Sequence, residues 1–193
     1  MTAGKWVRAT WFGWLLGVPC IALLALLGEA VGIGGAQGLV GAGMGAGVGA
    51  LQALALRRIL NQPVWWLVSS TVGLALPFVA TDLARSLGRN PTYSLLGSVA
   101  VGGIIVGVWQ SRLLRSALPS SGVWAALCSG GWLVAAIIAA AADREFRAHR
   151  VTGIAGALLY LGIIAAGGLA LGLITAPLVV RMRTKTNEVE SGR

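Results

Sequence analysis

Long apolar runs alternate with short polar segments along this chain of 193 residues. Six of the runs contain no charged residue, and each of them is at least 20 residues long. Crossing about 30 Å of hydrocarbon takes about 20 helical residues, so each run is long enough to span a bilayer. The pattern therefore predicts six transmembrane helices, at residues 9–28, 31–56, 64–81, 93–111, 122–142 and 152–180.

Little of the chain lies outside these runs, and the composition agrees with a membrane location. Apolar residues make up 56% of the sequence and charged residues 11%, whereas soluble domains are about 25% charged. We therefore expect an all-α integral membrane protein with one domain over residues 1–183 and a short polar tail over residues 184–193. No loop is long enough to form a separate soluble catalytic domain.

The basic residues are unequally divided between the two sides of such a bundle. An even number of spans places both termini on one side, and that side carries ten Lys and Arg residues against five on the other. Cytoplasmic loops retain positive charge, so we expect both termini in the cytoplasm, in a bacterial inner-type membrane. The net charge of +9 does not indicate nucleic-acid binding, because the basic residues are scattered at helix ends, where they face lipid headgroups.

A motif recurs along the chain and predicts how the spans are grouped. The pattern Gly-x-x-x-Gly-x-x-Gln-x-x-x-x-Arg begins at Gly45 and again at Gly103, 58 residues later. The last span keeps the two glycines and the arginine but has Thr175 in place of the glutamine. We therefore expect three tandem helical hairpins in parallel orientation.

The other three spans carry a complementary pattern. Each begins with a tryptophan at the expected cytoplasmic edge and ends with a carboxylate at the outer edge, about one membrane crossing later. The pairs are Trp11 with Glu29, Trp65 with Asp82, and Trp124 with Asp143.

Together these features resemble small bacterial multispan membrane proteins of uncharacterised function, whose repeated glycine-rich helices end in the Gly-x-x-Gln-x-x-x-x-Arg pattern before a Trp-rich helix. The resemblance covers roughly residues 41–181, and the chain departs from it at Thr175. It implies the repeated architecture and implies no substrate.

Glycines form stripes along the even-numbered spans. In lipid, small residues let helix backbones approach closely, so these stripes predict helix-packing faces. The alternative is that they line a pore or leave room for a flat ligand such as a pigment or quinone. The residues expected to pack are Gly41, Gly45, Gly49, Gly103, Gly107, Gly168 and Gly172.

Two glutamines are the principal polar side chains inside the spans. Gln52 and Gln110 each lie five positions before a cytoplasmic arginine. The favoured interpretation is an interhelical hydrogen bond. The alternative is a pair of groups that coordinates an ion or solute near the cytoplasmic mouth.

The three outer carboxylates, Glu29, Asp82 and Asp143, have two interpretations as well. They could form a ring that attracts cations to an external vestibule. Two of them also have an arginine at helical spacing, Arg85 for Asp82 and Arg147 for Asp143. Surface ion pairs are therefore the favoured interpretation.

Few residues in the sequence suit catalysis or metal binding. His149 is the only histidine, and the two cysteines, Cys20 and Cys128, lie at different depths of apolar spans. We expect no enzymatic activity and no metal site. The sequence leaves open whether a pigment, quinone or lipid is bound as a cofactor.

Two functions remain. The leading one is a non-enzymatic membrane bundle that self-associates as a homo-oligomer, or serves as an accessory subunit, by packing its glycine faces against partner transmembrane helices. The alternative is a small channel or carrier, whose pathway leads from the carboxylates to the two glutamines. A dry, closely packed core favours the first function, and a continuous polar cavity that reaches both glutamines favours the second.

Overall fold

The computed structural model describes residues 1–89, 94–118, 120–149 and 153–182, and within these residues it contains six α-helices and no strand. All six are long and apolar enough to cross a membrane, so the expected all-helical class with six candidate spans is confirmed. The helices are α1 (Ala3–Ala30), α2 (Gly38–Leu56), α3 (Val64–Ser86), α4 (Leu95–Leu113), α5 (Ser121–His149) and α6 (Gly153–Val180).

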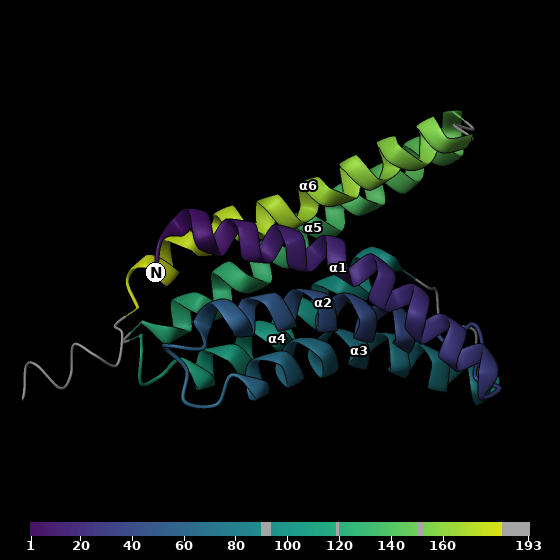
Figure 1. Cartoon of the computed structure of the whole chain (residues 1–193). Coiled ribbons are helices and arrows are strands. Elements are labelled where there is room, and N and C mark those ends of the chain that lie inside the picture. Colours follow the sequence, from purple (N-terminus) through teal and green to yellow (C-terminus); the bar gives the residue numbers. More distant parts are fainter. Residues whose placement is uncertain (90–93, 119, 150–152, 183–193) are drawn as a thin grey trace, which may run out of the picture.

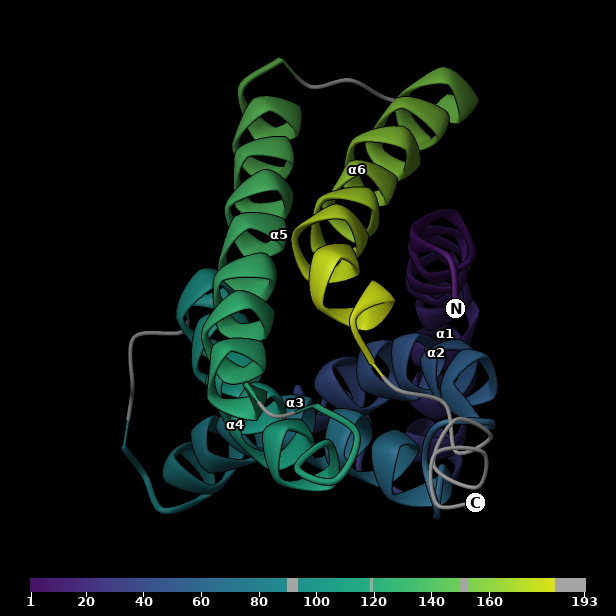
Figure 2. The same cartoon turned by 90° about the vertical axis from the view of Figure 1, so that its left-hand side faces the viewer.

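The helices form a closed ring. Each helix packs against the helices that precede and follow it in sequence, and α6 packs against α1. The start of α1 and the end of α6 lie at the same end of the bundle (Figure 1), which we call the terminal end. At the opposite end, here the far end, α5 and α6 tilt away from the other four helices (Figures 1 and 2).

The first helix begins earlier than the charge pattern predicts. It starts at Ala3 rather than at residue 9, and it includes two basic residues, Lys5 and Arg8. Thr2 caps it, because its Oγ1 accepts a hydrogen bond from the Lys5 N–H at 3.4 Å. Charges mark where the hydrocarbon begins, but they do not interrupt a helix that continues into water.

The second helix begins later than predicted, at Gly38 rather than at residue 31. Two glycines in the connection, Gly32 and Gly35, adopt φ angles of +80° and +75°, which side-chain-bearing residues rarely adopt. The chain therefore makes a tight turn over residues 31–37 that an unbroken apolar run conceals.

The third helix extends to Ser86, past the predicted limit at residue 81, and ends at a glycine. Gly88 has a φ of +74°, and its N–H donates to the Arg85 carbonyl at 2.9 Å. The following N–H, of Arg89, donates to the Ala84 carbonyl at 3.0 Å. This is a Schellman motif, which satisfies the last carbonyls of the helix. The predicted tail over residues 184–193 lies outside the described residues.

Candidate functional site

Helix α2 is in backbone contact with both of its neighbours. Gly41, Gly45 and Gly49 face α3, where a Cβ added at Gly41 would lie 2.5 Å from the Leu74 carbonyl oxygen. Gly43 faces α1, where an added Cβ would lie 2.7 Å from the Ile21 Cα. These distances leave no space for a side chain, so α2 packs closely between α1 and α3.

The glycines of the other even-numbered helices also lie where two helices of the chain approach closely. A Cβ at Gly107 would lie 2.8 Å from the Ala125 carbonyl oxygen on α5, and Gly103 also faces α5. Gly168 and Gly172 both face α1 and close the ring. All seven glycines expected to pack therefore contact helices of their own chain, and their faces are not free for a partner helix.

Three tryptophans meet at the centre of the terminal end. Trp6, Trp66 and Trp124 come from the three odd-numbered helices, and all three are almost fully buried. Their ring centroids lie 5.4 to 6.4 Å apart in edge-to-face arrangements. Such contacts place the positive edge of one ring against the negative face of the next.

Each indole N–H of this group donates a hydrogen bond to a polar side chain on an adjacent even-numbered helix. Two of the acceptors are the glutamines singled out by the sequence, and the third is the threonine that replaces a glutamine in the last span. The bonds run from Trp66 to Gln52 Oε1 (3.1 Å), from Trp124 to Gln110 Oε1 (3.2 Å) and from Trp6 to Thr175 Oγ1 (2.8 Å).

The glutamines also use their amide donors. Gln52 Nε2 donates to Thr10 Oγ1 at 3.1 Å, and Gln110 Nε2 donates to Ser70 Oγ at 3.0 Å. Both ends of each glutamine side chain are thus engaged by other helices of the chain, as the favoured interpretation expects. We call these eight residues the Trp–Gln network: Trp6, Trp66, Trp124, Gln52, Gln110, Thr175, Thr10 and Ser70.

The sequence pattern aligned the tryptophans that begin the odd-numbered spans, and these are not the same three residues. It aligned Trp11 and Trp65 with Trp124, whereas the structure places Trp6 and Trp66 with Trp124, and Trp65 is 45% exposed. One signal was available in the sequence. The separations from Gln52 to Trp66 and from Gln110 to Trp124 are both 14 residues.

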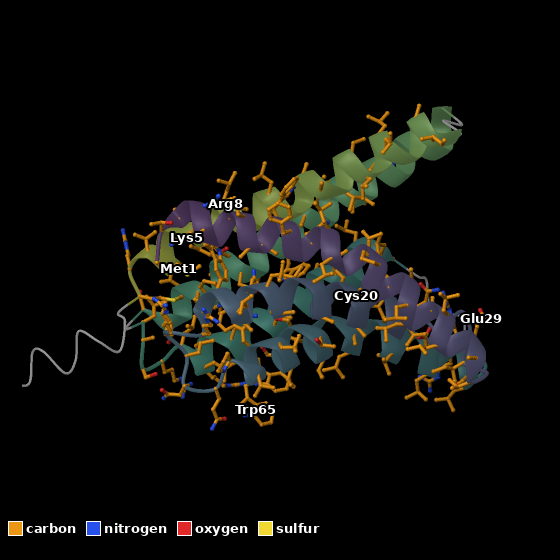
Figure 3. The ribbon with its side chains drawn as sticks, in the orientation of Figure 1. Met1, Lys5, Arg8, Cys20, Glu29 and Trp65 are labelled. Carbon is orange, nitrogen blue, oxygen red and sulfur yellow. The ribbon has the colours of Figure 1, made fainter. Side chains whose placement is uncertain are left out.

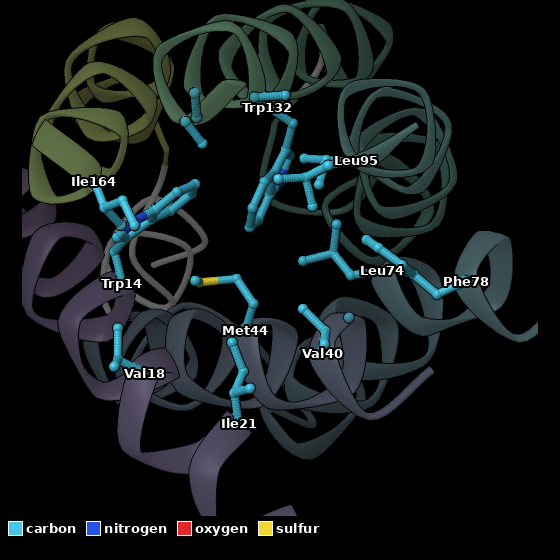
Figure 4. Close-up of a pocket in the computed structure, with 15 residues that line it drawn as sticks. Trp14, Val18, Ile21, Val40, Met44, Leu74, Phe78, Leu95, Trp132 and Ile164 are labelled. Carbon is cyan, nitrogen blue, oxygen red and sulfur yellow. The ribbon is translucent and has the colours of Figure 1, made fainter. Parts of the chain in front are cut away.

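An apolar cavity lies at the centre of the ring of helices (Figure 4). Its volume is about 270 Å³. All six helices contribute to its walls, whereas the two glutamines and the two described carboxylates, Glu29 and Asp82, do not. The side chains labelled in Figure 4 are Trp14, Val18, Ile21, Val40, Met44, Leu74, Phe78, Leu95, Trp132 and Ile164.

The cavity wall follows the same threefold pattern as the tryptophan group. Eight residues after Trp6, Trp66 and Trp124 the chain has Trp14, Leu74 and Trp132, and all three of these residues line the cavity. Trp14 and Trp132 contact each other, with ring centroids 5.3 Å apart. The residues twelve positions on also line the cavity, and they are Val18, Phe78 and Ala136.

The described carboxylates lie at the far end and have separate surroundings. Glu29 is exposed near the end of α1 (Figure 3). Asp82 is half-buried, and its Oδ2 accepts a hydrogen bond from the Gly38 N–H at 2.8 Å, so it caps the start of α2. The side chains of Asp143 and Arg147, which were expected to pair, lie outside the described residues.

We predict that Asp82→Ala lowers the unfolding free energy by about 1 kcal/mol, because the Gly38 N–H loses a charged acceptor at the helix start. Thermal unfolding in detergent measures the change. Glu29→Ala is the matched control, because Glu29 is an exposed carboxylate at the same end. Equal effects of the two substitutions would contradict the capping role.

Within the described part of the chain, no three His, Cys, Asp or Glu side chains lie close enough to hold a metal ion. Cys20 and Cys128 are both free thiols, and Cys128 is buried beside the Trp–Gln network, 3.7 Å from Gln110 Oε1. Comparisons of the chain with protein-family models, with curated proteins and with solved structures find no match. The chemistry of the site itself therefore carries the functional argument.

Proposed function

We propose that the chain is a non-enzymatic integral membrane protein that holds a lipid-soluble molecule at the centre of its ring of helices. The observation that carries this proposal is the apolar cavity of about 270 Å³, to which all six helices contribute. An apolar cavity of about 150 Å³ inside a protein stays dry and binds benzene. A larger cavity in a membrane is suited to a hydrocarbon chain or a flat ring system, which the bilayer itself can supply.

The Trp–Gln network supports binding over conduction of polar solutes. Its three indoles pack tightly at the terminal end of the bundle, and its glutamine amides are engaged by other side chains of the bundle. A pathway for ions or polar solutes requires polar groups along the pore. The apolar cavity wall does not supply them, which counts against the channel or carrier alternative.

We propose that the bundle consists of three duplicated hairpins, which are α1 with α2, α3 with α4, and α5 with α6. Support for a threefold repeat comes from the tryptophan of each odd-numbered helix, because each bonds an equivalent position on the even-numbered helix of the neighbouring hairpin. In the membrane we place the terminal end, which carries Lys5 and Arg8 (Figure 3), on the cytoplasmic side of a bacterial inner membrane.

A role as an accessory or self-associating subunit would have to use another surface than the glycine stripes. Those stripes pack inside the chain, because a Cβ at Gly45 or Gly107 would collide with a neighbouring helix. A partner helix would instead contact exposed aliphatic side chains on the outside of the ring, such as Leu26, Leu83 and Leu173.

Ala139→Phe tests the proposed function by filling the cavity, because Ala139 lines it. We expect about a tenfold or greater loss of affinity for an apolar fluorescent probe such as 1-aminoanthracene, since overpacking costs about 1–3 kcal/mol and 1.4 kcal/mol is a factor of ten. Fluorescence titration of the purified protein in mild detergent measures the affinity. Mass spectrometry of the same preparation identifies any small molecule that copurifies with it.

Ala141→Phe is the matched control, because Ala141 lies on the same helix and is exposed. It adds the same ring outside the cavity and should leave probe affinity unchanged. Equal probe binding by the Ala139 variant and the original protein would refute the central binding site.

A further inference from the structure

A second hollow lies on the outside of the ring, between α1 and α2 near the terminal end. Its floor is apolar and includes Phe12 on α1 and Leu51 and Leu54 on α2. Two arginines, Arg8 and Arg57, also line it. Among the residues that the structure describes, the lining contains no acidic side chain, and both of its charged side chains are positive.

The apolar floor faces outward, toward the space that the bilayer occupies around a spanning bundle. Phe12 is 52% exposed and Leu54 is 57% exposed. The two arginines are exposed as well, and they lie where the helices leave the apolar run. The hollow thus joins a surface suited to hydrocarbon with a pair of cations at the depth of the lipid headgroups.

The guanidinium groups of Arg8 and Arg57 can bind a phosphate group. Arg8 Nε donates to the Gly4 carbonyl at 3.3 Å, and this bond leaves the two terminal nitrogens of the guanidinium available to a ligand. Arg57 is the C-cap residue of α2, on the adjacent helix. Two arginines on different helices can contact one phosphate from two directions, each with a bidentate geometry.

We propose that this hollow binds one anionic phospholipid, with its phosphate between Arg8 and Arg57 and an acyl chain along Phe12 and Leu54. The site is separate from the central cavity and does not depend on what occupies that cavity. A zwitterionic lipid binds more weakly, because its own positive group lies close to the two arginines.

The paired cations are particular to the first hairpin. Arg57 corresponds to Arg115 in the repeated motif, 58 residues later. Arg8 follows Trp6 by two positions, and the residue two positions after Trp66 is Val68. The second hairpin therefore has one cation where the first has two, which makes Arg115→Gln a matched control for the loss of one charge.

Native mass spectrometry tests the proposal by titrating the intact protein in detergent with phosphatidylglycerol or with phosphatidylcholine. We expect one phosphatidylglycerol to bind in preference to phosphatidylcholine. Arg8→Gln or Arg57→Gln should each weaken phosphatidylglycerol binding about fivefold, and the double variant about thirtyfold. Arg115→Gln should leave it unchanged, and the double Lys variant, which keeps both charges, should keep most of the preference.

Three results would overturn the proposal. The preference could survive in the double Gln variant, or it could fall equally in Arg115→Gln, which would indicate a diffuse effect of net charge. Inorganic phosphate could also displace the lipid at similar concentration, which would show that the acyl chain contributes nothing. Thermal unfolding of each variant in detergent, with a midpoint within a few degrees of the original, verifies that lost binding is not lost folding.

Discussion

Replacing Gly47 with alanine is expected to separate α1 from α2 and to destabilise the bundle strongly. An added Cβ would lie 2.6 Å from the Gly17 Cα and 2.7 Å from the Gly13 carbonyl oxygen. All of these neighbours are backbone atoms, so no flexible side chain can move aside. We expect a loss of at least about 3 kcal/mol, the upper end of typical overpacking costs, and a fall of about 10 °C in the unfolding midpoint.

Gly130→Ala provides the matched control for this prediction. Gly130 lies inside α5, and a Cβ added there would meet no atom within 4 Å. Alanine favours a helix over glycine, so this variant should be as stable as the original protein or slightly more stable. Thermal unfolding followed by size-exclusion chromatography in detergent compares the two variants. Equal stability of the Gly47 and Gly130 variants would contradict the close approach of α1 and α2.

Replacing Gln52 with leucine should destabilise the bundle by breaking two buried hydrogen bonds of the Trp–Gln network. The substitution removes the acceptor of the Trp66 N–H and the donor to Thr10 Oγ1. Trp66 and Thr10 are both fully buried, so neither atom can turn to water. Interhelical hydrogen bonds in membranes average about 0.6 kcal/mol, and a buried orphan group costs about 1–3 kcal/mol, so we expect a loss of about 2–3 kcal/mol.

A double-mutant cycle separates the hydrogen bond from the shape of the side chain. Trp66→Phe removes the same N–H donor, so its cost and the cost of Gln52→Leu should overlap by about 1 kcal/mol in the double variant. Gln37→Leu is the control, because Gln37 lies before α2 and its amide bonds only to the Gly35 carbonyl nearby, at 3.3 Å. Strict additivity would show that the Trp66–Gln52 bond contributes nothing to stability.

The repeated motif was visible in the sequence because its glycines and its glutamine lie on the same helix. The glycine and glutamine positions of the motif lie on a single helix, so their spacing repeats without gaps. The tryptophans lie across a loop from the glutamines, at the same separation of 14 residues in both copies, but the pattern aligned the neighbouring Trp65 in place of Trp66. Trp6 is the extreme case, because its acceptor, Thr175, is 169 residues away in the sequence.

The sequence by itself determined the six apolar spans and the polar side chains within them. A span depends on one property, the length of an uncharged run relative to the thickness of hydrocarbon, and every residue in the run contributes to it locally. In the structure, each of the six runs forms a helix that is long and apolar enough to cross a membrane.

Only the tertiary structure determined which residues surround the glycines and the polar side chains within these spans. It turned the glycine stripes toward helices of the same chain, joined both glutamines to tryptophans, and closed α6 on α1 around an apolar cavity. Lipid tails are as apolar as the helices, so hydrophobicity alone does not select which faces meet. Which helix faces meet depends on shape and hydrogen bonding between residues far apart in the chain. The local periodicity of the sequence does not specify these contacts.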